Sequence, residues 1–287
     1  MRKIATIGFF DGVHRGHRFL FNLLRQEATK RGLEPLIVTF DHHPRAVLQA
    51  DYVPQLLTLP DERKALLSKE AKAVFFPFEQ IHTLTAAEFI KILHSEYEVD
   101  VLMMGYDHQF GSDRLRHPQD YRHVGAENGV EVMTMGEYID GEWHVSSTEI
   151  RQALENGNIA LANELLGYPY QLSGIVEHGK GIGRKIGFPT ANICPDSNEK
   201  TVPRNGVYVV STMLKGIGLI RGILNIGTNP TVGNTKRTIE LHLPGFHGDI
   251  YGQSLTICFE RFVREEKKFA TLDDLRAQIK DDLAEVR

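Results

Sequence analysis

Two histidines near the start of the chain have a spacing that suits phosphate chemistry. His14 and His17 lie three residues apart in the segment GFFDGVHRGH, which begins at Gly8. Residues three apart share a face if the segment is helical. Imidazole groups can donate hydrogen bonds to phosphate oxygens and to the charge that develops on them. Three interpretations stay open: a phosphate site at a helix N-terminus, a surface turn, and a metal site, although a helical metal pair is usually spaced i, i+4 and no acidic third ligand is obvious.

A second group of polar residues occurs in the run VSSTEIR. Ser146, Ser147 and Thr148 are residue types that cap helices, and their hydroxyl and N–H groups could also bind phosphate. Arg151, one turn further on, adds a forked cation. Taken alone, the run is typical of a helix start. In the same domain as the two histidines, it favours a phosphate site.

The second half of the chain contains the glycine-rich segment GKGIGRKIGFPTANI. Its glycines, which include Gly183, are interspersed with basic residues such as Lys185. Such a segment could cover phosphates as a flexible cationic flap, or could simply be a turn. Thr190 and Asn192 lie two apart and, on a strand, would project from the same face. A hydroxyl and an amide oxygen side by side could ligate Mg²⁺ or hydrogen-bond ATP.

One carboxylate in the second half stands out because apolar residues surround it. Glu240 begins the apolar part of IELHLPGFHGDIYGQ, within a run that is typical of a strand. A carboxylate on such a strand is either outward-facing and solvated, or inward-facing and functional. The residues around it leave both interpretations open.

The elements that must position these groups differ between the two halves. In residues 1–167, apolar runs alternate with amphipathic stretches, which predicts βαβ units and a parallel sheet covered on both faces. Gly32 could end the first helix, and Thr85 with Glu88 forms a capping-box signature for another. The predicted strands are 4–7, 36–40, 73–76, 101–104 and 130–133, and the predicted helices include 61–69, 147–156 and 159–166.

After Gly167 the pattern is that of an all-β domain. Gly, Pro and Asn separate β-branched apolar runs with no long helical pattern between them, which predicts an antiparallel sheet or small barrel. The runs are 172–176, 207–213, 217–226, 238–243 and 255–263. Leu272, Leu275, Ile279 and Leu283 then follow helical spacing, so we expect one amphipathic helix to close the chain.

Composition supports two domains and excludes several protein classes. The 287 residues are enough for roughly two domains. Residues 1–167 carry 17 Lys+Arg against 24 Asp+Glu, and residues 168–287 carry 16 against 13, so the charge changes sign near Gly167. The net charge of −4 argues against a protein that coats nucleic acid. No run predicts a membrane span or a secretory signal, and two distant cysteines favour a reducing cytoplasm.

The motifs together resemble a known family. GFFDGVHRGH and VSSTEIR, with TFDHHPRAVL, LTLPDERKALL and GYDHQFG between them, are similar to the adenylyltransferase module of bacterial bifunctional riboflavin kinase/FAD synthetases. GRKIGFPTAN, NIGTNPTVG, IELHL with GDIYGQ, and REEKKF resemble the riboflavin kinase module. The resemblance implies a Rossmann-like HxGH nucleotidyltransferase domain over residues 1–167. It implies a small antiparallel β-barrel with a closing helix, the riboflavin kinase domain, over residues 168–287.

For the first domain, the resemblance implies adenylyl transfer from ATP to FMN. His14 and His17 would hold the ATP phosphates and stabilise the transition state, while Arg151 would clamp the triphosphate from the other side. The FMN phosphate would attack the α-phosphorus of ATP, and pyrophosphate would leave. Further ATP-binding residues implied by the resemblance are Gly8, Phe9, Gly16, Ser147 and Thr148, and Asp107 would contact the flavin.

For the second domain, the resemblance implies phosphorylation of riboflavin. Thr190 and Asn192 would bind Mg²⁺ with ATP, and Glu240 would be the general base that deprotonates the ribityl 5′-hydroxyl. The implied phosphate-binding residues are Gly183 and Lys185, and Arg264 would lie near the flavin. One departure concerns Pro244 and Gly245, which stand where many members have an acidic residue before Phe246.

Three hypotheses follow for the whole chain. The first is a bifunctional enzyme that makes FMN and then FAD, with ATP, riboflavin, FMN and FAD as its partners and neither nucleic acid nor membrane. The second is an enzyme with one degenerate module. The third is a flavin-binding regulator that has lost the chemistry. Intact phosphate motifs favour the first, and the oligomeric state stays open.

Overall fold

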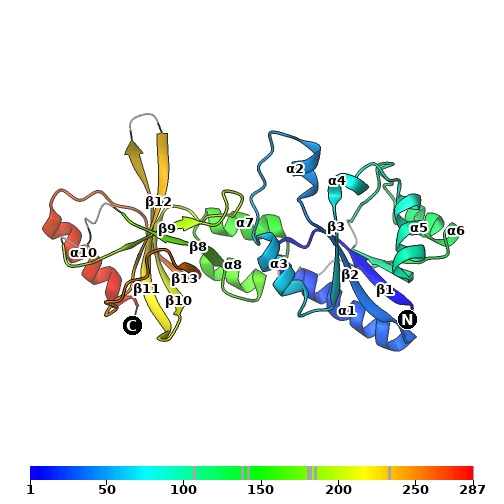
Figure 1. Ribbon diagram of the computed structural model, residues 1–287, viewed down its shortest axis with the longest axis horizontal. Coiled ribbons are helices and arrows are strands. Elements are labelled where there is room, and N and C mark those ends of the chain that lie inside the picture. The colour runs from blue at the N-terminus through cyan, green and yellow to red at the C-terminus, as the bar shows by residue number, and fades with distance from the viewer. Residues whose placement is uncertain are drawn as a thin grey trace. The chain divides into compact units, whose positions relative to one another are not determined.

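The computed structural model describes residues 1–105, 108–136, 139–140, 143–179, 183, 186–231 and 234–286 (Figure 1). Its contacts divide the chain into two compact units, Met1–Ser147 and Thr148–Arg287. Each unit is built around a β-sheet of its own, one open and one closed.

The first unit contains the predicted parallel sheet. Its strands are β1 (Lys3–Ile7), β2 (Glu34–Phe40), β3 (Lys72–Phe76), β4 (Val99–Met104) and β5 (Glu131–Thr134), in the order β3-β2-β1-β4-β5. Strand β1 pairs in parallel with β2 on one side and with β4 on the other. The strand order therefore reverses beside β1, and open α/β sheets bind ligands at the carboxyl ends of the strands at such a point.

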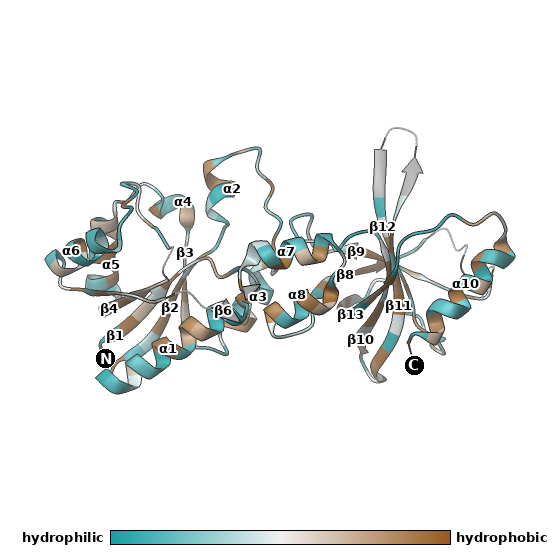
Figure 2. Ribbon diagram, turned by 180° about the vertical axis from the view of Figure 1, so that it is seen from behind, coloured by the Kyte–Doolittle hydropathy of each residue, from teal (hydrophilic) through white to brown (hydrophobic). Residues whose placement is uncertain are grey.

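Helices cover both faces of this sheet because side chains alternate along each strand. Ile4 and Ile37 pack with α1 (Arg15–Arg31) and α3 (Pro60–Leu67), whereas Ala5 and Leu36 face the core shared with α5 (Ala86–Tyr97) and α6 (Pro118–Glu127). Figure 2 shows the central strands as the more hydrophobic segments. The unit also contains the 3₁₀ helix η1 (Asp11–Val13), α2 (Pro44–Leu48), α4 (Phe78–Ile81), β6 (Ile139–Asp140) and β7 (Trp143–His144).

Two predicted helix ends are confirmed. Gly32 adopts a left-handed φ of 66° and its N–H bonds to the carbonyl groups of Ala28 and Thr29, which ends α1. Thr85 and Glu88 form a reciprocal capping box at the start of α5. The short helices α2 and α4, and the longer α6, were not predicted from the sequence pattern.

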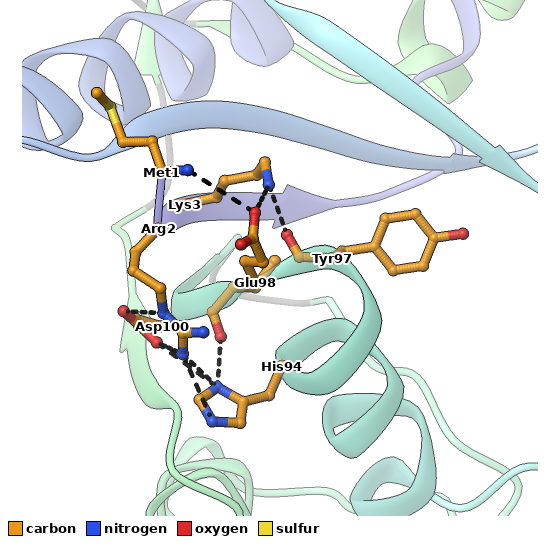
Figure 3. Close-up of polar contacts among 8 residues, drawn as sticks. Met1, Arg2, Lys3, His94, Tyr97, Glu98 and Asp100 are labelled. Carbon is orange, nitrogen blue, oxygen red and sulfur yellow. Dashed lines mark hydrogen bonds and ion pairs between the residues drawn. The ribbon is translucent and has the colours of Figure 1, made fainter.

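A polar cluster fastens the beginning of β1 to its neighbours (Figure 3). Arg2 pairs with Asp100 of β4, with Nε 2.7 Å from Oδ2, and Lys3 Nζ lies 2.8 Å from Glu98 Oε2. The hydrogen bond from Arg2 is the main reason why the pKa of Asp100 is lowered. The arginine also contacts His94 of α5. This polar cluster lies at the start of β1, whereas the histidine motif follows the end of β1. We therefore regard the cluster as structural.

The second unit contains the predicted antiparallel barrel. Its strands are β8 (Gln171–Glu177), β9 (Ala191–Pro195), β10 (Gly206–Leu214), β11 (Gly218–Thr231), β12 (Asn234–His242) and β13 (Ser254–Arg264). They close in the order β10-β11-β12-β9-β8-β13. The predicted closing helix is α10 (Leu272–Ala284), and Thr271 caps it by accepting a hydrogen bond from the N–H of Asp274. Hydrophobic and hydrophilic residues alternate around α10 in Figure 2, as its predicted amphipathic pattern requires.

Two helices join the sheet and the barrel in the sequence. They are α7 (Ser147–Glu155) and α8 (Ile159–Leu166). Helix α8 packs on the barrel, because the side-chain amide of Asn163 donates to the Phe259 carbonyl at 2.9 Å and accepts from the N–H of Tyr170 at 2.7 Å. In the part of the chain that the structure describes, no helix is long and apolar enough to cross a bilayer.

Candidate active sites

The histidine motif lies where β1 leads into α1, at the carboxyl edge of the sheet. Between them, the β1–α1 loop (residues 8–13) includes two non-glycine residues at positive φ, Phe10 at 57° and Val13 at 39°. Such values are unfavourable for bulky side chains and persist only where the surroundings enforce them. Here the buried Asp11 supplies the constraint, because its carboxylate accepts hydrogen bonds of 3.0 Å from the N–H groups of Leu57 and Thr58.

His14 is the residue that caps α1. Its Nδ1 accepts a hydrogen bond of 3.3 Å from the backbone N–H of His17, and its side chain is buried. An Nδ1 atom that accepts a hydrogen bond carries no proton, so we assign the neutral ring its proton on Nε2. The cap therefore fixes the tautomer that can donate a hydrogen bond from Nε2.

His17 lies against His14 in a parallel stack. The two ring centroids are 3.5 Å apart and the planes differ by 19°. The His17 Nδ1 atom is inaccessible to solvent and makes no hydrogen bond to any residue that the structure describes. Burial of the ring, and secondly the neighbouring His14, lower the pKa of His17 well below its usual range. At neutral pH the stacked pair therefore includes an uncharged His17.

Close approaches explain two glycines of the motif. A Cβ atom on Gly16 would lie 3.0 Å from the carbonyl oxygen of Val145 and 3.2 Å from the His14 ring. A Cβ atom on Gly8 would lie 2.7 Å from the ring of Phe10, so neither position accepts a side chain without a shift. The contact at Gly16 also shows that the segment before α7 lies against the start of α1.

Of the residues on α7 that are predicted to bind the triphosphate, Ser147 contacts the β1–α1 loop. The Ser147 hydroxyl donates a hydrogen bond of 2.9 Å to the backbone carbonyl of Asp11, which joins the start of α7 to the β1–α1 loop. Thr148 directly follows Ser147 in the first turn of α7 and Arg151 lies one turn further on, both within the second compact unit. The role of both residues stays a prediction.

Arg63 is a residue of this region that the sequence analysis missed. It lies on α3 and is 1% exposed, and its guanidinium is 3.8 Å from the ring centroid of Phe9. An arginine in the pattern DERKALL looks like one of several solvated charges on a helix, so no sequence signal separates it from its neighbours. Two predicted residues, Asp107 and Lys185, lie outside the described residues.

The second site is a cavity of about 600 Å³ in the barrel, which is within the usual range for small-molecule sites. One row of residues that are register partners on five adjacent strands lines this cavity. The row runs through Asn192, Glu240, Asn225, Val207 and Arg264. Glu240 is half-buried in this wall and not on the solvated outer face, so its side chain is available to a ligand.

The predicted metal pair lies beside this carboxylate. The Thr190 Oγ1 is 3.4 Å from the Glu240 Oε2, and Asn192 of β9 is the register partner of Glu240 of β12. Thr190 immediately precedes β9, and both it and Asn192 line the cavity as their spacing predicted. A Cβ atom on Gly183 would overlap the Phe188 carbonyl and approach Thr190 Oγ1 to 3.3 Å, so the backbone of Gly183 lies close to this group.

Helix α10 closes the other side of the cavity. Arg264 at the end of β13 makes a two-pronged ion pair with Asp282 of α10, with distances of 2.8 and 2.7 Å. The Asp282 side chain is only 4% exposed. The pair thus fixes a predicted flavin residue and the helix together. Apolar lining on this side comes from Phe269, Leu275 and Ile279.

A smaller hollow of about 250 Å³ adjoins the cavity at Thr190, which lines both. Pro189, Leu243, Phe246 and Tyr251 provide an apolar and aromatic lining. Phe246 lines this hollow although Pro244 and Gly245, and not an acidic residue, precede it. The replacement therefore does not remove Phe246 from the wall. Among all the described residues, no cluster of three or more His, Cys, Asp or Glu residues could hold a metal ion.

Comparison with known proteins assigns the two parts of the chain to two families. Residues 1–149 match the FAD synthetase family model, and residues 166–287 match the riboflavin kinase family model. The chain is 37% identical over 284 residues to the bifunctional riboflavin kinase/FMN adenylyltransferase of Escherichia coli K12, covering 97% of this chain and 90% of the relative. The enzymes of the same description in Pseudomonas fluorescens and Bacillus subtilis are 38% and 34% identical, over 99% of this chain and 92% and 91% of the relatives.

A solved structure is similar over the whole chain. It is described as a macrolide-efflux protein from Streptococcus pneumoniae, and it matches with a TM-score of 0.90 at 31% identity. The match covers 100% of this chain and 94% of the other.

Proposed function

This chain belongs to the family of bifunctional riboflavin kinase/FMN adenylyltransferases, and we propose that the two sites described above carry its two reactions. The enzyme phosphorylates riboflavin to FMN with ATP and then adenylylates FMN to FAD, with release of pyrophosphate. We assign the kinase reaction to the barrel cavity and adenylylation to the histidine site. The observation that carries the assignment is that Glu240, Thr190 and Asn192 converge in one cavity wall.

In the adenylylation site, the histidines act on the phosphates of ATP. An oxygen of the FMN phosphate attacks the α-phosphorus, the bond to the bridging oxygen of the β-phosphate breaks, and pyrophosphate leaves. His14 donates a hydrogen bond from Nε2 to a phosphate oxygen, because its capping bond fixes that tautomer. His17 binds the same group from the neighbouring ring. Catalysis here is positioning and electrostatic stabilisation, and needs no covalent intermediate.

The remaining residues of this site hold the triphosphate and the flavin. Gly8, Phe9 and Gly16 provide a loop that comes close to the phosphates, and Arg151 with Thr148 binds them from α7. Ser147 supports this arrangement through its bond to the Asp11 carbonyl. Asp107 contacts the flavin of FMN.

In the kinase site, Glu240 acts as the general base. Its carboxylate accepts the proton of the ribityl 5′-hydroxyl as that oxygen attacks the γ-phosphorus of ATP, and ADP leaves. Its neighbours in the wall support this role, because Thr190 and Asn192 carry polar groups that can hold the phosphates beside it. Gly183 and Lys185 belong to the segment that covers them.

Both families use ATP with a divalent metal ion. The barrel residues fit Mg²⁺, because the hydroxyl of Thr190, the amide oxygen of Asn192 and the carboxylate of Glu240 are the hard oxygen donors that this ion prefers. We propose that Thr190 and Asn192 hold it. When bound, it would neutralise phosphate charge.

The two hollows of the barrel differ in a way that suits two substrates. The apolar side of the larger cavity, next to Arg264, suits the flavin ring. The smaller aromatic hollow suits the adenine of ATP, because Thr190 lies where the two hollows adjoin. In this arrangement the phosphates of ATP reach Thr190 from one side and riboflavin reaches Glu240 from the other.

We propose that the functional division follows Gly167, although the body of α7 clusters with the barrel. Residues 1–167 then include Thr148 and Arg151 with the adenylylation site, and residues 168–287 form the kinase. Cys194 and Cys258 are not joined in a disulfide, which supports a reducing cytoplasm as the setting.

A chromatographic time course tests these assignments. Wild-type enzyme given riboflavin, ATP and Mg²⁺ should form FMN and then FAD. His17→Ala enzyme should stop at FMN, because only the adenylylation site is changed, with a loss of about 100-fold or more in FAD formation. Unchanged FAD formation from FMN by this variant would show that the histidine assignment is wrong.

A further inference from the structure

Arg63 is a buried cation directly behind the adenylylation site. Its side chain leaves α3 and ends between the β1–α1 loop and the end of β2. One terminal nitrogen donates to the carbonyl oxygens of Phe40 and Asp41, at 2.6 and 3.2 Å. The guanidinium carbon lies 3.8 Å from the centroid of the Phe9 ring. These contacts join three segments that end at the carboxyl edge of the sheet.

The surroundings do not balance this charge in full. Among the described residues, the hydrogen bonds of Arg63 go to backbone carbonyls and not to a carboxylate, and its buried Nε atom has no hydrogen-bond partner. Asp11 and Asp41 are close enough to favour the charged form, but burial is the larger effect and lowers the pKa of Arg63 to about 10. The group is still charged at neutral pH. A buried cation without a matching anion is costly, and an apolar side chain could fill the same space.

We propose that Arg63 is a positioning residue for adenylyl transfer, whose buried positive charge, acting through Phe9 and the β1–α1 loop, favours binding of the ATP triphosphate. An anion next to this loop compensates the charge in a region that water does not screen well. The proposal rests on the function assigned to His14 and His17, because it requires the triphosphate at that loop.

The hydrogen bonds of Asp11 and its neighbour Gly12 hold this arrangement rigid. The carboxylate of Asp11 binds the N–H groups just before α3, and the N–H of Gly12 donates to the hydroxyl of Thr58 at 2.9 Å. Helix α3 and the β1–α1 loop therefore form one body, so the charge of Arg63 is held at a fixed place relative to His14.

The test compares Arg63→Lys with Arg63→Met in the full-length enzyme, with FMN as the starting flavin. We expect Arg63→Met to raise the KM for ATP by about 10-fold, and Arg63→Lys to stay within about 3-fold of wild type at neutral pH. A buried lysine loses its charge at a lower pH than arginine does. The KM of Arg63→Lys, relative to wild type, should therefore rise toward that of Arg63→Met between about pH 8 and pH 10.

This pH dependence separates a role for the charge from a role in packing. The proposal is overturned if the KM of Arg63→Lys, divided by that of wild type, does not change with pH, or equals that of Arg63→Met at every pH. If Arg63→Met does not fold, the pH dependence of Arg63→Lys alone decides. The charged groups that face the site are Asp11 and Asp41, with His43 against the same Phe9 ring, and all are unchanged in the variants.

Two controls complete the experiment. Arg2→Met makes the same change at the opposite end of β1 and should leave the KM for ATP unchanged. Riboflavin phosphorylation by the barrel should be equal in all variants. His17→Ala in the same assay tests the site itself: if it loses adenylylation while Arg63→Lys follows wild type at every pH, only the proposal on Arg63 is wrong.

Discussion

The hydroxyl group of Ser147 donates a hydrogen bond of 2.9 Å to the backbone carbonyl of Asp11, a residue 136 positions earlier in the chain. Its proton is therefore used within the protein. The carboxylate of the same Asp11 holds the segment before α3. Asp11 thus connects the β1–α1 loop to two distant segments, and Ser147 serves the site by fixing this connection.

Ser147→Ala should weaken adenylylation without affecting the kinase. Loss of one neutral hydrogen bond costs about 1 kcal/mol, so we expect kcat/KM for ATP with FMN as substrate to fall by about 5-fold. Steady-state rates measured separately from riboflavin and from FMN check this.

Ser95→Ala is the matched control for that variant. Ser95 also donates to a backbone carbonyl, that of Lys91 at 2.8 Å, but within the exposed surface of α5. It should retain wild-type rates in both reactions. Equal behaviour of the two variants would contradict the role given to Ser147.

His17 should remain uncharged in the free enzyme over the physiological pH range, because burial and His14 lower its pKa. Its imidazole signal in a proton NMR titration should show no ionisation near about pH 6.5, where an unfolded histidine titrates. A midpoint at or above that value would contradict the stacked, desolvated geometry.

The same shift makes stability depend on pH with a definite sign. Below about pH 6.5 the unfolded chain binds a proton at His17 that the folded chain does not, so this contribution is complete above that pH and is lost as the pH falls. The free energy of unfolding, relative to that of His17→Asn, should decrease on acidification. A difference that stays constant between pH 7 and pH 5 would be inconsistent with the shift.

Sequence patterns predicted the architecture well because it depends on local signals. Apolar runs, Gly32 and the capping pair of Thr85 and Glu88 are each readable within a few residues, and all are found as predicted. The histidines also lie together, although the reason differs: His14 is the cap of α1 and accepts a bond from His17.

The features that sequence could not predict depend on long-range pairing. Asn225 joins Glu240 in the cavity wall only because β11 and β12 pair in one particular register, which no local pattern specifies. Arg63 looks like a surface charge until the fold buries it beneath Phe9. Asp11 gives no sign in the sequence that its partners lie at residues 57 and 58.

Asp282→Asn should impair the kinase through Arg264. The variant keeps the shape of the side chain but removes the charge that holds the guanidinium at 2.7 and 2.8 Å. We expect the KM for riboflavin to rise by about 10-fold and the unfolding free energy to fall by about 1–3 kcal/mol. Kinase kinetics and chemical denaturation of the full-length protein measure the two effects.

Asp281→Asn is the control for this variant, since its side chain is the exposed neighbour on α10. It should change neither quantity, and adenylylation of supplied FMN should be the same in both variants. A normal KM for riboflavin in Asp282→Asn would show that the ion pair does not support the flavin site.

The most direct test of the central assignment is the flavin product profile of Glu240→Gln. The variant keeps the size of the side chain but removes the base, so we predict that formation of FMN from riboflavin falls by about 100-fold or more, while FAD formation from supplied FMN stays within about 2-fold of wild type. Glu260→Gln, a change on β13 where the carboxylate pairs with Arg221, should match wild type in both reactions. Undiminished FMN formation by Glu240→Gln, or loss of both reactions in a folded variant, would contradict the assignment of the two reactions to two sites.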